Sequence, residues 1–186
     1  MHLESEMQEL TSILKEATKA IPGDYFQLPV AGKEDLIYRE RVYCYELYHH
    51  IRALWPEGTP YSLCGEVDKS GHPLIRGNNL DRTKPDFLVH VPGQMDYNEL
   101  VMEVKPINAG KPGIRKDLQS LTAYRMKAEY QRAILLVYGG SQNELDRFKK
   151  KVRSIVEQNR DAAIDRQIVE LWHHSTCGQI AESVGW

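Results

Sequence analysis

The order of periodic segments in the sequence predicts an α/β fold with a mixed sheet and helices on both faces. Three short strand-like segments follow one another between residues 61 and 105 with brief turns between them, which predicts an antiparallel meander. The apolar run "AILLVY" at 133–138 comes after a helical segment, so it predicts a crossover into a strand of the sheet interior. The expected order of the main domain is helix, three-strand meander, helix, strand, helix, strand.

Two parts of the chain are expected. Residues 3–20 carry apolar side chains at helical spacing, and the proline- and glycine-containing segment "IPGDYFQLPVAGKED" after them reads as a linker. Residues 1–33 are therefore predicted to form an N-terminal helix and linker, and residues 34–186 the main domain. The first helix of that domain is expected at 34–54, because an apolar stripe ends there at Pro56.

The remaining elements are predicted from the spacing of apolar residues and from the turn-forming residues between them. Alternating apolar and polar residues, bounded by Gly, Pro, Asn, Asp or Ser, predict strands in 61–72, 85–91 and 99–105. A continuous apolar strand is predicted in 132–140 and a last strand in 166–174. Amphipathic spacing predicts helices at 114–130 and 142–160.

Composition excludes several classes of protein. Hydrophobic residues make up 41% and charged residues 27% of the 186 residues, as in ordinary globular domains. No apolar run approaches the roughly 20 residues that span a bilayer, and the acidic start "MHLESEMQEL" lacks the pattern of a secretory signal, so no membrane partner and a cytoplasmic location are expected. Cys44, Cys64 and Cys177 form no C-x-x-C pair, which argues against a structural zinc site.

The charge of the chain leaves nucleic-acid binding open. A formal net charge of -2 argues against binding through bulk charge. Basic residues nevertheless concentrate in 111–132 and in "RFKKKVR" at 147–153. These segments are either solvated helix faces or one local basic surface.

The stretch "KPDFLVHVPGQMDYNELVMEVKP" at 84–106 carries the candidate site. In a strand over 99–105, Glu103 and Lys105 share one face, and the opposite face is wholly apolar. Asp86 opens the preceding strand directly after Pro85, a residue that suits a strand's first position. A hairpin of these two strands brings Asp86 close to Glu103 or Lys105.

Two carboxylates and a lysine at one sheet end suit a hard divalent cation. Mg²⁺, or Mn²⁺ in its place, takes oxygen ligands, which Asp86, Glu103 and the carbonyl of Val104 can supply. Lys105 can orient the attacking water or offset charge on a phosphate. The alternative is an ion pair of little energetic value between Glu103 and Lys105, with Asp86 as a turn residue.

Pro85-Asp86 followed by Glu103-Val104-Lys105 resembles the motif of the PD-(D/E)XK nuclease superfamily over residues 36–175. The resemblance implies a restriction-endonuclease-like fold and a Mg²⁺-dependent nuclease that hydrolyses phosphodiester bonds, in DNA rather than RNA. "RVYCYELYHHIRALW" resembles the first core helix of bacterial members, which gives a metal-site glutamate at Glu46, with Glu40 as the second choice. The resemblance also implies that the helix after the motif supplies a residue to the same site, which in this sequence is Gln119.

The resemblance also implies a setting. Compact nucleases without a specificity domain work in bacterial defence, mobile-element or repair systems, with a protein partner or as a homodimer. Two alternatives remain: an inactive module of the same fold that binds nucleic acid or a protein, and an unrelated α/β interaction protein.

Other polar residues have weaker claims to the site. Glu66 and Asp68 share a strand face and either line the cleft or form a solvated edge. His90 shares the face of Asp86. His49 and His50 are interpreted as residues on the polar flank of a helix. His173 and His174 are interpreted as structural residues.

Overall fold

The computed structural model describes residues 2–66, 83–94, 97–158 and 163–186. The helices are α1 (His2–Ala20), α2 (Glu40–Ala53), α3 (Lys111–Lys127) and α4 (Gln142–Gln158), with a 3₁₀ turn at Gly23–Tyr25. The strands are β1 (Gln27–Leu28), β2 (Ile37–Tyr38), β3 (Ser62–Cys64), β4 (Phe87–His90), β5 (Asn98–Pro106), β6 (Arg132–Tyr138), β7 (Glu170–His174) and β8 (Glu182–Ser183).

Within the described residues, β3 to β8 form one mixed six-stranded sheet in sequence order. β3, β4 and β5 pair antiparallel, which confirms the predicted meander. β6 lies parallel to β5 and to β7, so it is the interior strand that the run "AILLVY" predicted. The separate pair β1–β2 forms a small antiparallel hairpin.

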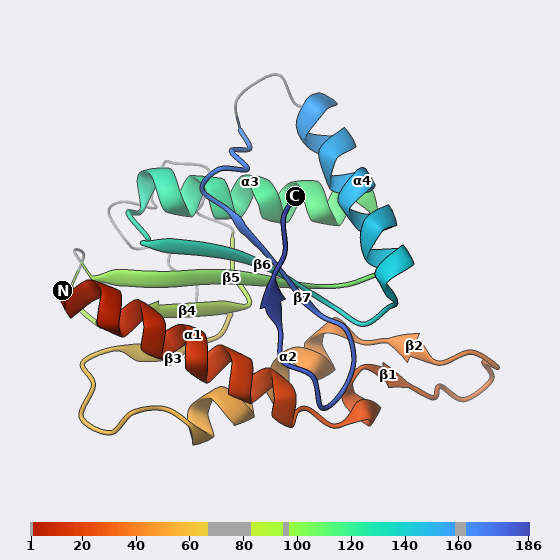
Figure 1. The fold of residues 1–186 in the computed structure, drawn as a ribbon, viewed down its shortest axis with the longest axis horizontal. Coiled ribbons are helices and arrows are strands. Elements are labelled where there is room, and N and C mark those ends of the chain that lie inside the picture. Colours follow the sequence, from red (N-terminus) through yellow and green to blue (C-terminus); the bar gives the residue numbers. More distant parts are fainter. Residues whose placement is uncertain (1, 67–82, 95–96, 159–162) are drawn as a thin grey trace.

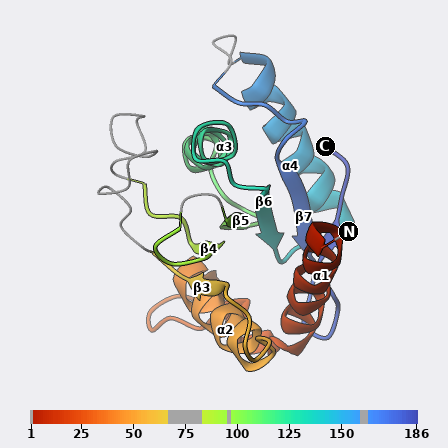
Figure 2. The ribbon, with the colours of Figure 1, turned by 90° about the vertical axis from the view of Figure 1, so that its left-hand side faces the viewer.

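Helices cover both faces of the sheet, as predicted. α3 and α4 lie on one side of the strands, and α1 and α2 lie on the other (Figures 1 and 2). Two parallel crossovers of the same hand, β5–α3–β6 and β6–α4–β7, place α3 and α4 together on one face.

The period of the strands divides the core between these two layers. Leu100, Met102 and Val104 of β5 pack in the cluster that includes α1 and α2, as the predicted apolar face requires. Val101, on the opposite face, packs in the cluster that includes α3 and α4. β6 is buried along its whole length, which explains its unbroken apolar sequence.

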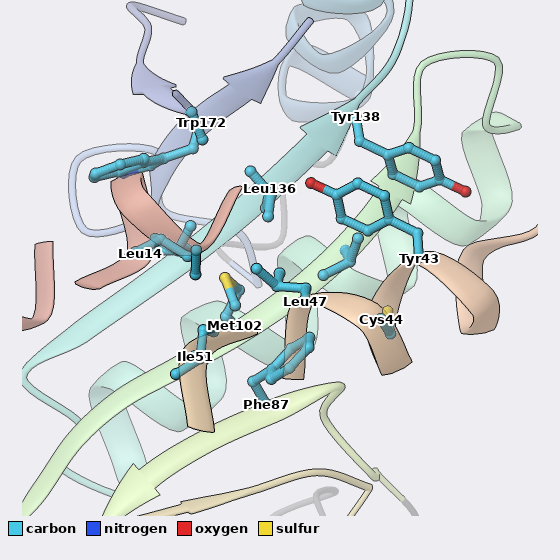
Figure 3. Packing of buried hydrophobic residues seen from close by; sticks show 14 of the residues in the cluster. Leu14, Tyr43, Cys44, Leu47, Ile51, Phe87, Met102, Leu136, Tyr138 and Trp172 are labelled. Carbon is cyan, nitrogen blue, oxygen red and sulfur yellow. The ribbon is translucent and has the colours of Figure 1, made fainter. Parts of the chain in front are cut away.

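An aromatic group fixes α2 on the sheet. The rings of Tyr43 on α2 and Tyr138 on β6 stack with centroids 3.9 Å apart (Figure 3). The Tyr43 hydroxyl is 2.7 Å from Nδ1 of His174 on β7. Since all three side chains are fully buried, these contacts set which face of α2 meets the sheet.

The N-terminal helix shares the main core. Leu14 and Ala17 of α1 are buried in the same cluster as α2 and Trp172 (Figure 3). Thr18 also accepts a hydrogen bond from the backbone N–H of Ala181 at 2.9 Å. The boundary predicted at residue 33 stays a prediction, but α1 contributes to the packing of the residues that follow it.

The local differences from prediction lie at element ends and in short strands. The helix predicted at 34–54 begins only at Glu40, because Ile37 and Tyr38 pair with β1 inside the predicted linker. β8 was also missed, since its two exposed residues have no readable period. Asp68 and the second half of the strand predicted at 61–72 lie outside the described residues.

No helix of the described part of the chain is long and apolar enough to cross a bilayer.

The packing of α2 predicts the effect of two leucine substitutions. Leu47 is fully buried against the sheet, whereas Leu54, at the end of the same helix, is 45% exposed. Leu47→Ala is expected to lower the free energy of unfolding by about 2–5 kcal/mol through lost burial and a residual cavity. Leu54→Ala should change it by less than about 1 kcal/mol, as measured by urea denaturation. Equal effects of the two substitutions would contradict this placement of α2.

Candidate active site

Asp86 and Glu103 meet where β4 begins. Phe87 pairs with Met102, so the antiparallel register places Asp86 opposite Glu103. Oδ2 of Asp86 accepts a 2.7 Å hydrogen bond from the backbone N–H of Val104. A hydrogen bond also links the Asp86 and Glu103 carboxyl groups. The predicted approach of Asp86 to Glu103 is therefore present.

Lys105 lies beside this pair and contacts three different elements. Its Nζ is 2.9 Å from Oε2 of Glu40 at the start of α2 and 2.9 Å from Oδ2 of Asp117 on α3. It also donates to the carbonyl of Val104 at 3.2 Å. The ammonium thus donates hydrogen bonds to Glu40 and to the carbonyl of Val104 and forms an ion pair with Asp117.

Burial makes the carboxylates of this cluster unusually basic. It raises the pKa of Asp86 to about 6, partly offset by the hydrogen bond from Val104 and the charge of Lys105. Burial, followed by the nearby charges of Asp86 and Asp117, raises the pKa of Glu103 well above its ordinary value. Burial raises the pKa of Asp117 too, against the opposing effect of Lys105.

Lys105 remains an ammonium in this setting. Burial lowers its pKa, but the charges of Asp117 and Glu40 outweigh burial and raise the pKa above the ordinary lysine value. Lys105 can therefore donate hydrogen bonds and stabilise negative charge near neutral pH, but it cannot take a proton from water.

These residues line a pocket of about 570 Å³. This volume is in the range of small-ligand sites. α2 and α3 form two of its walls, and the start of β4 forms a third. Ser120 of α3 also lines the pocket, and its buried Oγ has no hydrogen-bond partner among the described residues. The pocket thus contains a hydroxyl group without a hydrogen-bond partner among the described residues, beside a cluster of carboxyl groups.

The donor set fits a hard divalent cation, although the present contacts do not form a metal site. In the described part of the chain, no three His, Cys, Asp or Glu side chains are arranged to hold a metal. Lys105 lies between Glu40 and Asp117, and Asp86 is turned toward the N–H of Val104. Four carboxyl groups, of which those of Glu103 and Asp117 are buried, nevertheless line the pocket around a single ammonium, and carboxylates held together in this way are stabilised by a cation.

α2 places Glu40 in the pocket and turns Glu46 away from it. Glu46 does not line the pocket, and its Oε1 lies 3.2 Å from Nε2 of His50 instead. Since successive helical residues are about 100° apart, Glu40 and Cys44 share a face that Glu46 cannot reach. Both glutamates were candidates from the sequence, and it is the second choice, Glu40, that lines the pocket.

α3 shows the same effect of helical phase. Gln119, the predicted contribution of this helix, is half-buried and does not line the pocket, whereas Asp117 and Ser120 do. Asp117 was missed because it stands among basic residues in 111–132, where it reads as one charge of a solvated face. The missed signal was its spacing from Ser120, which puts both on one helix face.

Comparison of the chain with protein-family models, with curated proteins and with solved structures found no match. The structure thus establishes an α/β fold with a mixed sheet. Which superfamily the chain belongs to rests on the motif and on the geometry of the site.

The other sequence candidates lie at the rim of the pocket or beyond it. Glu66 lines the rim and forms an exposed ion pair with Arg41 at 2.8 Å. His90 does not line the pocket, and its Nε2 is 3.6 Å from Sγ of Cys64. His49 packs against the ring of His50 on the outer part of α2.

His173 and His174 have the structural surroundings predicted for them. Nε2 of His173 is 2.9 Å from the carbonyl of Gly139, and His174 contacts Tyr43. Burial lowers the pKa of both, in His174 to about 4, so both are neutral near neutral pH.

The raised pKa of Asp86 predicts how pH acts on stability. The folded chain holds the Asp86 proton up to about pH 6, whereas the unfolded chain releases it near pH 4, so the contribution of this group falls as pH rises. His173 and His174 act in the opposite direction. The comparison with Asp86→Asn therefore isolates the carboxyl group from both histidines.

The stability of the wild type relative to Asp86→Asn should fall by about 1–2 kcal/mol between about pH 5 and pH 7.5. Urea denaturation of both metal-free proteins at these two pH values measures it. A stability difference that stays constant, or that grows with pH, would show that Asp86 is not a buried carboxyl group of raised pKa.

Proposed function

We propose that the protein is a divalent-metal-dependent nuclease of the PD-(D/E)XK superfamily that hydrolyses phosphodiester bonds, with DNA as the favoured substrate. The observation that carries the proposal is the convergence of Asp86, Glu103 and Lys105 at one end of the sheet. Chance matches to a short motif have no reason to meet in a pocket. The restriction-endonuclease-like topology and the setting in bacterial defence, mobile elements or repair belong to the same proposal.

The roles of the residues follow from their chemistry. Asp86, Glu103 and the carbonyl of Val104 would hold Mg²⁺ or Mn²⁺, and the bound ion would polarise the phosphate and lower the pKa of a water molecule. Glu40 would join this set, because it already lies at the pocket beside Lys105. It takes the place that the sequence assigned first to Glu46.

Lys105 supplies positive charge for the reaction. As an ammonium it stabilises the charge that develops on the phosphate oxygens. Asp117 and Glu40 fix its position from the two helices on either side. Asp117 is therefore a positioning residue, which acts on the substrate through Lys105.

Cleavage assays with matched variants test the proposal. Purified protein is incubated with linear, circular and single-stranded DNA and with RNA, in Mg²⁺, in Mn²⁺ or in EDTA. Metal-dependent cleavage is expected, and Asp86→Ala and Lys105→Ala should each reduce it by at least about 100-fold. Glu40→Gln should reduce it strongly, whereas Glu46→Gln, on the same helix but outside the pocket, should retain most of it.

Thermal unfolding of each variant separates lost chemistry from lost folding. Equal residual cleavage by the wild type, Asp86→Ala and Lys105→Ala would indicate a contaminating nuclease and contradict the proposal. Nucleic-acid binding without cleavage, unchanged by EDTA, would identify an inactive binding module instead.

A further inference from the structure

The mouth of the pocket carries three exposed cations, one of which, Arg41, is paired with the exposed carboxylate of Glu66. Arg41 of α2, Lys84 just before β4 and Lys116 of α3 all line the pocket and are all exposed. These three cations come from different parts of the pocket lining and share the pocket with the carboxyl groups. Exposed cations around an acidic centre suit a chain of phosphates that crosses the mouth while one of them reaches the interior.

An aromatic side chain lies at the same mouth. Tyr45 lines the pocket and is 63% exposed, one helical turn after Arg41. No hydrogen bond or ring contact joins it to another described residue. Tyr48, which also lines the pocket, already has partners within the protein: its hydroxyl donates to the carbonyl of Leu63 and its ring stacks on Phe87.

An exposed ring beside phosphate-binding cations matches one feature of nucleic acids. Aromatic side chains stack on the flat faces of bases, and such stacking is tolerant of sequence. In a duplex these faces are covered by the neighbouring base pairs, so only an unpaired nucleotide presents one. The unpartnered, buried Oγ of Ser120 is a second free group in this pocket, and it can bond to a polar atom of the same nucleotide.

We infer that Tyr45, together with Arg41, Lys84 and Lys116, forms a subsite for an unpaired nucleotide next to the scissile phosphate. This inference rests on the proposed nuclease function and names its substrate class: a single-stranded or locally unpaired nucleic acid. The shared chemistry is that of an unpaired base on a phosphate chain, which single-stranded DNA and single-stranded RNA both provide.

Binding measurements test the subsite without requiring cleavage. Fluorescence anisotropy with short labelled oligonucleotides compares single-stranded DNA, single-stranded RNA and duplex DNA, with Ca²⁺ in place of Mg²⁺. Tyr45→Ala should weaken single-strand binding by roughly 5- to 100-fold and duplex binding by less than about 2-fold. Tyr45→Phe, which keeps the ring, should bind within about 2-fold of the wild type.

Tyr97 provides the matched control, since it is 52% exposed but does not line the pocket. Tyr97→Ala should leave all affinities unchanged. Lys84→Ala and Lys116→Ala should weaken both single-strand and duplex binding and reduce the dependence of affinity on salt. The DNA and RNA arms decide which single strand the subsite prefers.

Three outcomes would overturn the inference: no single-strand binding by the wild type, unchanged single-strand binding in Tyr45→Ala, or equal losses for single strand and duplex. The result is distinct from that of the cleavage assay. A loss specific to Tyr45→Ala in a protein that cuts nothing in Mg²⁺ supports the subsite and contradicts the hydrolysis. If the protein cleaves nucleic acid but Tyr45→Ala binds single strands as the wild type does, the result supports the hydrolysis and contradicts the subsite.

Discussion

The ammonium of Lys105 joins the sheet to both helix layers at the candidate site. It lies on β5, contacts Glu40 at the start of α2 and Asp117 on α3, and donates to the carbonyl of Val104. One cation thus ties together three elements that are far apart in the sequence. Asp86 and Glu103 lie directly beside it, so the pocket contains more buried carboxyl groups than the lysine can balance.

This imbalance constrains what the pocket can do. Burying carboxylates costs free energy unless protons, cations or hydrogen bonds compensate. In the metal-free chain this cost raises the pKa values of Asp86 and Glu103, so each holds its proton to a higher pH than an exposed carboxyl group does. In the proposed enzyme a divalent cation offsets this cost, so metal binding and proton release are coupled.

The alternation of side chains between the two faces of each strand made much of the candidate site predictable. In β5 the period of two separated Glu103 and Lys105 from an apolar face, and the hairpin with β4 brought Asp86 to them. The continuous run of β6 predicted a strand buried on both faces. These inferences succeeded because a strand has only two faces, and an apolar run identifies the buried one.

The helical contributions to the site were less predictable. A helix presents many directions, and the choice of Glu40 over Glu46 depends on the stacking of Tyr43 on Tyr138, which is 95 positions further along the chain. Asp117 was missed because its basic neighbours in the sequence made it read as one charge of a solvated helix face. The two-residue strands β1, β2 and β8 have no period to read, so only the tertiary pairing reveals them.

The most direct test of the central claim is a titration of the protein with Mn²⁺ near pH 7.5, with free Mn²⁺ followed by electron paramagnetic resonance. If Asp86 and Glu103 hold a divalent cation, the wild type will bind Mn²⁺ saturably, and Asp86→Asn and Glu103→Gln will each weaken binding by at least about tenfold. Lowering the pH toward 5 will also weaken binding by the wild type, because protons compete for the same carboxyl groups. Absence of saturable binding, or equal uptake by the wild type and both variants, would contradict a metal centre at this end of the sheet.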